Sequence, residues 1–164
     1  MYERARAYAA VSRRTRFEEL VDRHEPKLRG VVFAIVRDAD RVDDVLQDAF
    51  VRAYRKLPSS FESPRQEAAW LYRVVYTTCL NELRSRRRRR ESPGLPEPIG
   101  VGDDDRSALL ALDALAPAER AVVLLVDLIG LDYETAAAVL DVPRGTLGWR
   151  LSFARGKLRE ALDA

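Results

Sequence analysis

The stretch Val42-Asp-Asp-Val-Leu-Gln-Asp-Ala-Phe-Val-Arg-Ala-Tyr54 decides the fold class. Its apolar residues recur at the i, i+3, i+4, i+7 spacing of one helix face, and they are Val42, Val45, Leu46, Ala49, Phe50, Ala53, Tyr54 and Leu57. Acidic residues lie at the start of this segment and basic residues at its end, which suits the helix dipole. Pro58-Ser59-Ser60 ends it. The segment is therefore predicted to be an amphipathic helix.

Helical spacing continues on both sides, and no segment shows the alternation of a strand. Upstream, the apolar residues from Phe17 to Ile35 keep helical spacing, with Pro26 marking either a break or the first turn of a helix. Downstream, a third helix is predicted from about Arg65 through Leu80 into a run of arginines. The fold class is therefore expected to be all-α.

Residues 91–105 separate two helical halves. This segment has three prolines, three glycines and no helical period, and it carries five acids and no base, so it is predicted to be a flexible acidic linker. We expect an N-terminal extension at 1–15, a first domain at 16–90, the linker at 91–105, and a second domain at 106–164.

The second half has the pattern of a helix-turn-helix. Helices are predicted at 107–115, at 118–129 before Gly130, and at 133–140 with Asp132 as its cap. A long last helix follows Pro143, with Leu147, Leu151, Ala154, Leu158 and Leu162 on one face. A short helix, a tight turn and a longer helix form the arrangement whose second helix enters the DNA major groove.

Composition argues against an enzyme or a membrane protein. Hydrophobic residues make up 47% of the chain, yet no apolar run reaches the roughly 20 residues of a membrane span. The single cysteine, Cys79, excludes an internal disulfide and is interpreted as a buried thiol, which fits the cytoplasm. The only histidine, His24, lies on an apolar stripe, and the chain lacks a phosphate-binding loop or a Cys/His cluster. We expect no catalytic residue, metal, cofactor or small-molecule substrate.

Three acids at Asp43, Asp44 and Asp48 lie close together on the helix that begins near Val42. A divalent cation would be one explanation, but one helix face rarely supplies a complete set of ligands. A solvated or partner-binding acidic face is the preferred interpretation.

Charge is distributed unevenly. Residues 1–90 have a net charge of +8, residues 91–105 of −5 and residues 106–164 of −1. This asymmetry favours a polyanionic partner for the first domain.

A polar stripe on the third predicted helix strengthens that interpretation. Arg73, Thr77, Asn81, Arg84 and Arg88 follow one another at steps of three or four, and six arginines lie within residues 84–90. Guanidinium groups bind phosphates, an asparagine reads a base edge, and the bordering Trp70, Tyr72 and Tyr76 offer faces for an unpaired base. The alternatives are a solvated helix end for the arginines and core packing for the aromatic rings.

These motifs resemble those of extracytoplasmic-function (ECF) sigma factors. Val42–Tyr54 resembles the polymerase-binding helix of that family, and Trp70–Arg73, with Asn81 and Arg84, resembles its promoter-melting and −10-recognition helix. Ala116–Arg120, Leu131–Glu134 and Pro143–Leu147 resemble its C-terminal helix-turn-helix. The resemblance covers about residues 16–162.

The resemblance implies a region 2 helical bundle and a region 4 helix-turn-helix that bind core RNA polymerase and direct it to promoters. The surface expected on the β′ clamp helices contains Asp44, Gln47, Asp48, Phe50 and Arg52, which would explain why the helix exposes Phe50 or Val51. The loop from Pro58 to Ser63 matches the segment that captures a flipped −10 base. Residues expected to contact the −10 element are Ser59, Ser60, Phe61, Arg73, Tyr76, Thr77, Asn81, Arg84, Arg86, Arg87 and Arg88.

Region 4 would reach the polymerase β flap and the −35 element. The expected DNA-facing residues are Arg144, Thr146, Trp149, Arg150, Phe153 and Arg155. This domain departs from the family pattern, because Gly148, Trp149 and Phe153 stand where a cation, a serine and an arginine are usual, and in the first domain Thr77 replaces the usual asparagine. The aromatic pair would contact thymine methyls of an unusual −35 element, or it would face a protein such as an anti-sigma factor or the first domain. The 25 arginines against 3 lysines indicate a GC-rich genome.

Overall fold

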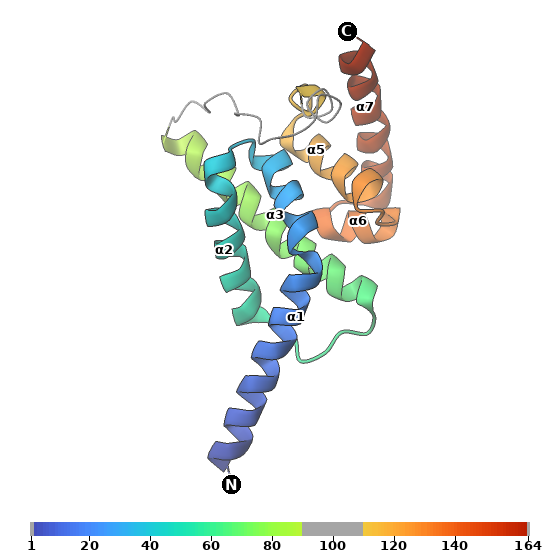
Figure 1. Cartoon of the computed structure of the whole chain (residues 1–164). Helices are drawn as coiled ribbons and strands as arrows, with labels where there is room; N and C mark the ends of the chain where they lie inside the picture. The colour runs from blue at the N-terminus through green and yellow to red at the C-terminus, as the bar shows by residue number, and fades with distance from the viewer. Residues whose placement is uncertain (1, 90–109, 164) are drawn as a thin grey trace.

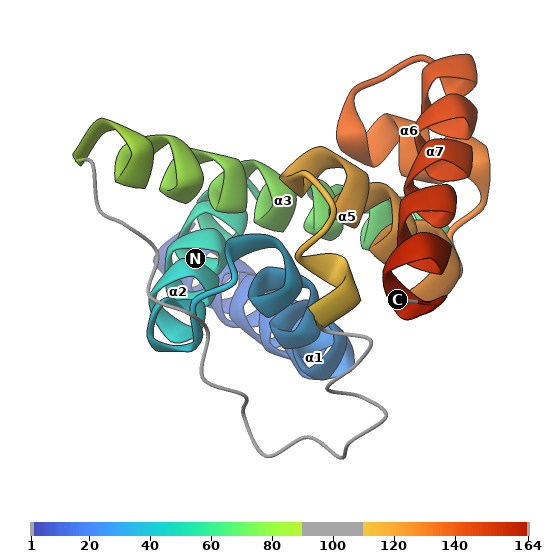
Figure 2. The same cartoon turned by 90° about the horizontal axis from the view of Figure 1, so that it is seen from above.

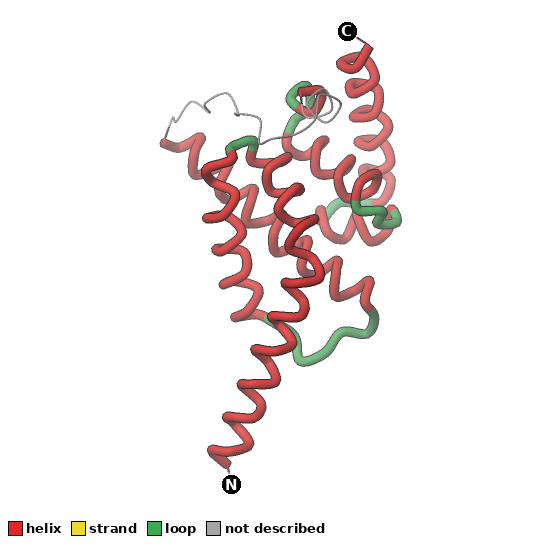
Figure 3. Tube along the Cα trace, in the orientation of Figure 1, coloured by secondary structure: helices red, strands yellow, loops and turns green. Residues whose placement is uncertain are grey.

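The described part of the chain, residues 2–89 and 110–163 of a computed structural model, consists of helices without a strand among them (Figures 1 and 3). The all-α prediction is confirmed. The linker predicted at 91–105 lies outside the described residues, as do the start of the helix predicted from residue 107 and Arg90 at the end of the arginine run.

The first helix, α1 (Tyr2–Val36), is longer than its apolar pattern indicates. Pro26 lies inside it, so the expectation that this proline breaks or opens a helix is wrong. An interior proline removes one backbone hydrogen bond and costs about 3 kcal/mol. Pro26 and Asp22 both lie on the exposed face, whereas Leu20 and Leu28 are buried on either side. Burial of such side chains, at about 1.5–3 kcal/mol each, offsets the cost.

The second helix, α2 (Ala39–Lys56), confirms most of the predicted apolar face, although Phe50 is half-buried and Tyr54 is exposed. Its buried residues are Val42, Val45, Leu46, Ala49 and Ala53. The helix begins after Asp38, whose side chain accepts a hydrogen bond from the Asp40 N–H at 3.1 Å. Between α1 and α2, Arg37 adopts a left-handed backbone conformation with φ of 55°, which turns the chain back so that the two helices pack side by side (Figure 1).

The third helix, α3 (Pro64–Arg89), packs against helices of both halves of the molecule. Helices α1 and α2 pack against it on one side and α6 packs against it on another, as Figure 2 shows. Leu71, Val75 and Cys79 are fully buried there. Burial raises the pKa of the Cys79 thiol to about 12, which agrees with the predicted buried, unreactive thiol.

The second half forms the predicted helix-turn-helix. Helix α5 (Pro117–Val123) continues into a π-helical turn, η1 (Leu124–Leu128), and the chain turns at Gly130, where φ is +80°. Helix α6 (Tyr133–Leu140) is capped by Asp132, which accepts from the Thr135 N–H at 2.9 Å. After a turn through Asp141, helix α7 (Arg144–Asp163) buries Leu147, Leu151 and Ala154 against the others.

The two halves contact each other along what we call the seam, formed by α6 on α3 and by α5 on α1. Among the described residues, three ion pairs cross it, and each joins an arginine of the first half to an aspartate of the second. Arg37 binds Asp113 through two hydrogen bonds of 2.6 and 2.9 Å, Arg65 lies 3.1 Å from Asp132, and Arg73 lies 3.7 Å from Asp141. Nothing in the local sequence pattern predicts these pairs.

Candidate polymerase and nucleic-acid interface

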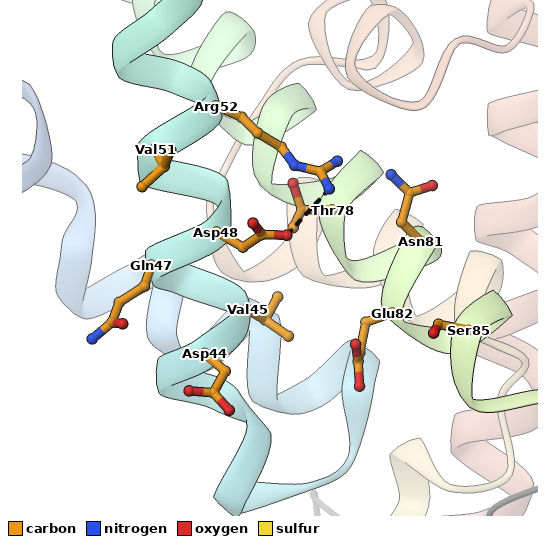
Figure 4. A pocket seen from close by; sticks show the side chains of 10 residues that line it. All are labelled: Asp44, Val45, Gln47, Asp48, Val51, Arg52, Thr78, Asn81, Glu82 and Ser85. Atoms are coloured by element: carbon orange, nitrogen blue, oxygen red, sulfur yellow. Dashed lines mark hydrogen bonds and ion pairs between the residues drawn. The ribbon is translucent and has the colours of Figure 1, made fainter. Parts of the chain in front are cut away.

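The outer face of α2 brings together four of the five residues predicted to contact the polymerase. Asp44, Gln47, Asp48 and Arg52 line one wall of an open pocket of about 520 Å³, and Thr78, Asn81, Glu82 and Ser85 of α3 line the other (Figure 4). Arg52 donates a hydrogen bond to Asp48 at 3.2 Å. The pocket therefore presents carboxylates, amides and one guanidinium to a partner.

The fifth predicted residue, Phe50, lies elsewhere. Its half-buried ring packs edge-on against Phe17 of α1, with 6.4 Å between the ring centroids. The apolar side chain that lies on the pocket is Val51, which is 48% exposed. The spacing Asp44, Gln47, Asp48, Val51 is itself i, i+3, i+4, i+7, so the sequence contained the signal for choosing Val51 over Phe50.

A second hollow, the basic groove, adjoins the pocket. It measures about 730 Å³ and is lined by Arg52, Asn81, Arg84, Arg87 and Arg88. We call the first hollow the acidic pocket, after Asp44, Asp48 and Glu82 in its lining. Arg52 and Asn81 line both hollows, so the acidic pocket adjoins the basic groove directly. Four guanidinium groups around one groove suit the binding of a phosphate backbone.

Arg86, which the sequence groups with these arginines, does not line the groove. Its side chain is 11% exposed, it donates to the Val36 carbonyl at 3.2 Å, and it forms an ion pair with Asp38. It stands seven residues after the buried Cys79 and therefore on the same, inward face of α3. This position makes Arg86 a structural residue that ties the end of α3 to the turn between α1 and α2.

The polar stripe of α3 lies on the surface as predicted, since its five residues are all exposed. Two of the residues predicted to contact the −10 element are already engaged, however. Arg73 donates to the Ala138 carbonyl of α6 at 3.3 Å, and the Thr77 hydroxyl donates to carbonyls of its own helix. Tyr76 is buried, and its burial raises its pKa while nearby Arg150 opposes the shift.

The α2–α3 loop exposes Ser59 and Ser60, two of the residues predicted to contact the flipped base. Phe61 is half-buried and its ring lies 5.5 Å from that of Trp70. The loop therefore presents two hydroxyls beside an anchored aromatic ring.

Helix α7 presents an aromatic stack formed by Trp149 and Phe153. The rings are 5.4 Å apart and nearly parallel, at 8°, and the residues are 66% and 46% exposed. The Lys157 ammonium lies 4.8 Å from the Phe153 ring centroid, and it also binds Glu119 at 3.1 Å.

The cations of α7 are partly neutralised by the rest of the second half. Arg155 makes two hydrogen bonds to Asp127, at 2.5 and 3.1 Å, and this partner raises its pKa further. Of the other predicted −35 residues, Arg144 is exposed, whereas Thr146 and Arg150 are half-buried. The exposed part of α7 thus combines an aromatic stack with cations that are partly paired to acids of the same half.

Within residues 2–89 and 110–163, no group of three or more metal-ligating side chains was found. None of the helices in those ranges is long and apolar enough to span a bilayer.

Comparison with known proteins assigns the two halves to one family. Residues 20–89 match Sigma-70 region 2, and residues 105–158 match Sigma-70 region 4. The ECF RNA polymerase sigma-E factor of Escherichia coli K12 is 32% identical over 90% of this chain and 84% of its own length. The RNA polymerase sigma-H factor of Pseudomonas aeruginosa is 29% identical over 90% of this chain and 86% of its own.

Two solved structures have similar folds. The sigma factor RpoE of Bartonella quintana, in complex with the anti-sigma factor NepR, matches 90% of this chain and 97% of its own with a TM-score of 0.77 and 27% identity. CnrH, in complex with the cytosolic domain of CnrY, matches 96% of this chain and 94% of its own with a TM-score of 0.69 and 28% identity. With both sigma regions matched in order and across nearly the whole chain, this protein belongs to the ECF sigma factors.

Proposed function

We propose a division of labour between the two halves in promoter-specific transcription initiation, the function of this family. The first half binds core RNA polymerase and opens the −10 element, and the last helix approaches the −35 element. The observation that carries the proposal is the junction of the acidic pocket with the basic groove along α2 and α3. One face can thereby hold a protein partner and a DNA strand next to each other.

The polymerase-docking surface is the pocket wall of α2. Asp44, Gln47 and Asp48 supply polar contacts, Arg52 completes them, and exposed Val51 supplies the apolar centre. A small apolar patch surrounded by polar groups is typical of a protein interface. The expected partner is the β′ clamp helices, with the β flap contacting region 4.

The DNA-binding surface is the basic groove together with the exposed stripe and the α2–α3 loop. Arg84, Arg87 and Arg88 hold the phosphates of the opened strand, Asn81 reads a base edge, and the loop residues Ser59, Ser60 and Phe61 receive a flipped base. We leave Arg86 out of this surface because it is buried in an ion pair.

Run-off transcription with core polymerase tests the function. The wild-type chain should yield promoter-dependent transcripts, whereas V51D should lose core binding because it places a charge at the apolar centre of the interface. L162D is the matched control, since it makes the same kind of change at an exposed residue near the end of α7. Equal core binding by both variants would place the docking surface elsewhere.

The role of α7 has two candidate forms. The helix-turn-helix geometry favours −35 recognition, in which Arg144 and Arg150 contact phosphates and the aromatic stack meets thymine methyls. Arg155 is paired with Asp127 and Lys157 with Glu119, which favours a helix that faces a protein. In that case the alternative function is a sigma-like regulatory protein whose helix-turn-helix does not read the −35 element. The anti-sigma factor NepR, bound to RpoE in one of the solved structures, indicates the kind of partner.

Fluorescence anisotropy with a randomised −35 duplex separates these forms. Sequence-dependent binding by the wild type that is lost in W149S supports −35 recognition. Absence of any sequence preference in the wild type would support the protein-facing alternative.

Three further expectations concern the mode of action, the cell compartment and the genome. The protein acts by binding rather than by catalysing a reaction, it works in the cytoplasm where RNA polymerase is found, and its 25 arginines against 3 lysines fit a gene from a GC-rich genome.

A further inference from the structure

Two arginines of α1 bind the far end of α2 and the loop that follows it. Arg13 donates to the backbone carbonyls of Tyr54 and Arg55, at 2.6 and 3.2 Å. Arg16, one turn further along α1, donates to the carbonyls of Pro58 and Ser59, at 2.6 and 2.8 Å. Two guanidinium groups therefore hold four backbone carbonyls around the end of one helix, two on each side of residues 56 and 57.

The end of α2 has few other hydrogen-bond donors. The helix closes at Leu57, whose φ of −57° and ψ of 118° do not form the left-handed cap that satisfies terminal carbonyls. The backbone hydrogen bond that the capping residue makes is long, at 3.5 Å from the Leu57 N–H to the Tyr54 carbonyl. Cations at a helix C-terminus also interact favourably with the helix dipole. Arg13 and Arg16 thus supply the cap that the α2 sequence lacks.

The other end of the loop is held by the start of α3. The Ser63 hydroxyl accepts from the Gln66 N–H at 3.1 Å, and the Gln66 side chain accepts from the Glu62 N–H at 2.6 Å. This reciprocal arrangement is similar to a capping box, with the N–H of Glu62 in place of that of Ser63. The loop is therefore anchored at both ends, with Ser59 and Ser60 exposed between the anchors.

We propose that Arg16, assisted by Arg13, is a positioning residue for −10 recognition. It binds the carbonyls of Pro58 and Ser59, and so sets the direction in which the hydroxyls of Ser59 and Ser60 face the flipped base. Arg16 itself does not contact DNA. The proposal rests on the proposed role of the loop in capturing that base. A loop held in its binding conformation before DNA arrives loses less entropy on binding, which raises both affinity and base selectivity.

The chain supplies a matched control. Arg14 lies between the two arginines in sequence, but it is exposed and binds Glu18 of its own helix at 2.8 Å. R14A therefore removes the same charge from the same helix as R16A does, without touching the loop.

The experiment measures holoenzyme binding to single-stranded oligonucleotides that carry the −10 strand of a promoter transcribed by the wild type. One oligonucleotide is intact and the other has an abasic site in place of the flipped base, and the ratio of their affinities measures base capture. R16A should reduce this ratio by about tenfold, as expected for the loss of charge-assisted hydrogen bonds that hold the loop. R14A should leave the ratio unchanged, and R16K, which keeps the charge but not the forked donor geometry, should fall between them.

Two further readouts distinguish positioning from general destabilisation. Core polymerase affinity should be equal in all variants, and hydrogen exchange should accelerate in R16A only at the amides of residues 57 and 59–63. A wild type that does not discriminate the abasic strand would overturn base capture by the loop and this inference with it. A wild type that discriminates, with R16A discriminating equally well, would overturn the inference alone.

Discussion

Neighbouring arginines of α3 have different roles because consecutive residues of a helix point in different directions, about 100° apart. Arg86 is buried and paired with Asp38, whereas Arg87 is exposed and lines the basic groove. Removing one partner of a buried ion pair leaves a charge without compensation and costs about 3 kcal/mol or more. R86A should therefore lower the free energy of unfolding by about 3 kcal/mol, whereas R87A should change it by less than about 0.5 kcal/mol.

Urea denaturation measures the free energy of unfolding of R86A and R87A. Binding of the −10 strand is then compared between R87A and the wild type. R87A should weaken that binding and its dependence on salt, because it removes one phosphate contact. If R86A proved as stable as R87A, the ion pair with Asp38 would contribute nothing to the fold.

Tyr72 gives the fold a weakness at alkaline pH. Its side chain is buried beside His24, and its hydroxyl has no hydrogen-bond partner among the described residues. Burial raises its pKa from 10.0 to about 12. Between these values the unfolded chain has released the proton and the folded chain still holds it. The free energy of unfolding therefore falls as the pH rises from about 10 to about 12.

Y72F removes both the unpaired hydroxyl and its ionisation. At neutral pH the variant should be more stable than the wild type by about 1 kcal/mol. Its advantage should grow by a further 2 to 3 kcal/mol or so across the alkaline window, since each unit of pKa shift corresponds to about 1.4 kcal/mol. Denaturation curves at pH 8, 10 and 12 measure this difference, and an advantage that stayed constant with pH would contradict it.

At the scale of the helix, Pro26 is the clearest conflict between sequence and structure. It removes a backbone hydrogen bond inside α1, yet the helix continues because buried residues hold both of its flanks. P26A should restore that bond and raise the free energy of unfolding by about 2 kcal/mol, the helix gain of about 3 kcal/mol less the entropy that proline removes from the unfolded chain.

P64A is the control for that prediction, since Pro64 occupies the first position of α3, where the missing N–H would be unpaired anyway. Its effect should be a loss of less than about 1 kcal/mol. Thermal unfolding measures both variants, and equal effects would mean that α1 is already interrupted at Pro26.

The elements that the sequence predicted best are those whose signals are local. Helix α6 begins and ends where Asp132 and the following turn predicted, and the buried face of α2 matches its apolar spacing. Predictions failed where a side chain's environment depends on distant segments. Arg86 belongs to an arginine run in sequence but to the core in space, and the caps supplied by Arg13 and Arg16 join residues more than 40 positions apart. The spacing of apolar residues within one segment contains no information on contacts between distant segments.

At the scale of the whole molecule, the seam places region 4 against part of the proposed DNA-binding face. Arg73 binds the Ala138 carbonyl and Asp141, and Tyr76 is buried, so neither is free to meet a DNA strand in this arrangement. The pairs of Arg65 and Arg73 are largely exposed, whereas Arg37 is buried where it binds Asp113. Raising the salt concentration from about 0.1 M to about 1 M shortens the Debye length from about 10 Å to about 3 Å, so the two exposed pairs should weaken first.

The double variant D132N/D141N should open the seam without unfolding region 4. Asparagine is a good helix N-cap in place of Asp132, and it tolerates the left-handed backbone at Asp141, where φ is 55°. The substitutions therefore remove only the charges that face Arg65 and Arg73. The radius of gyration from small-angle scattering should increase, and the free chain should bind the −10 strand about threefold to tenfold more tightly, as expected for the loss of two weak ion pairs. D22N/D163N changes the net charge equally at exposed sites away from the seam and should alter neither value. If D132N/D141N matched this control in both measurements, the seam would be held by the packing of α6 on α3 rather than by its charges.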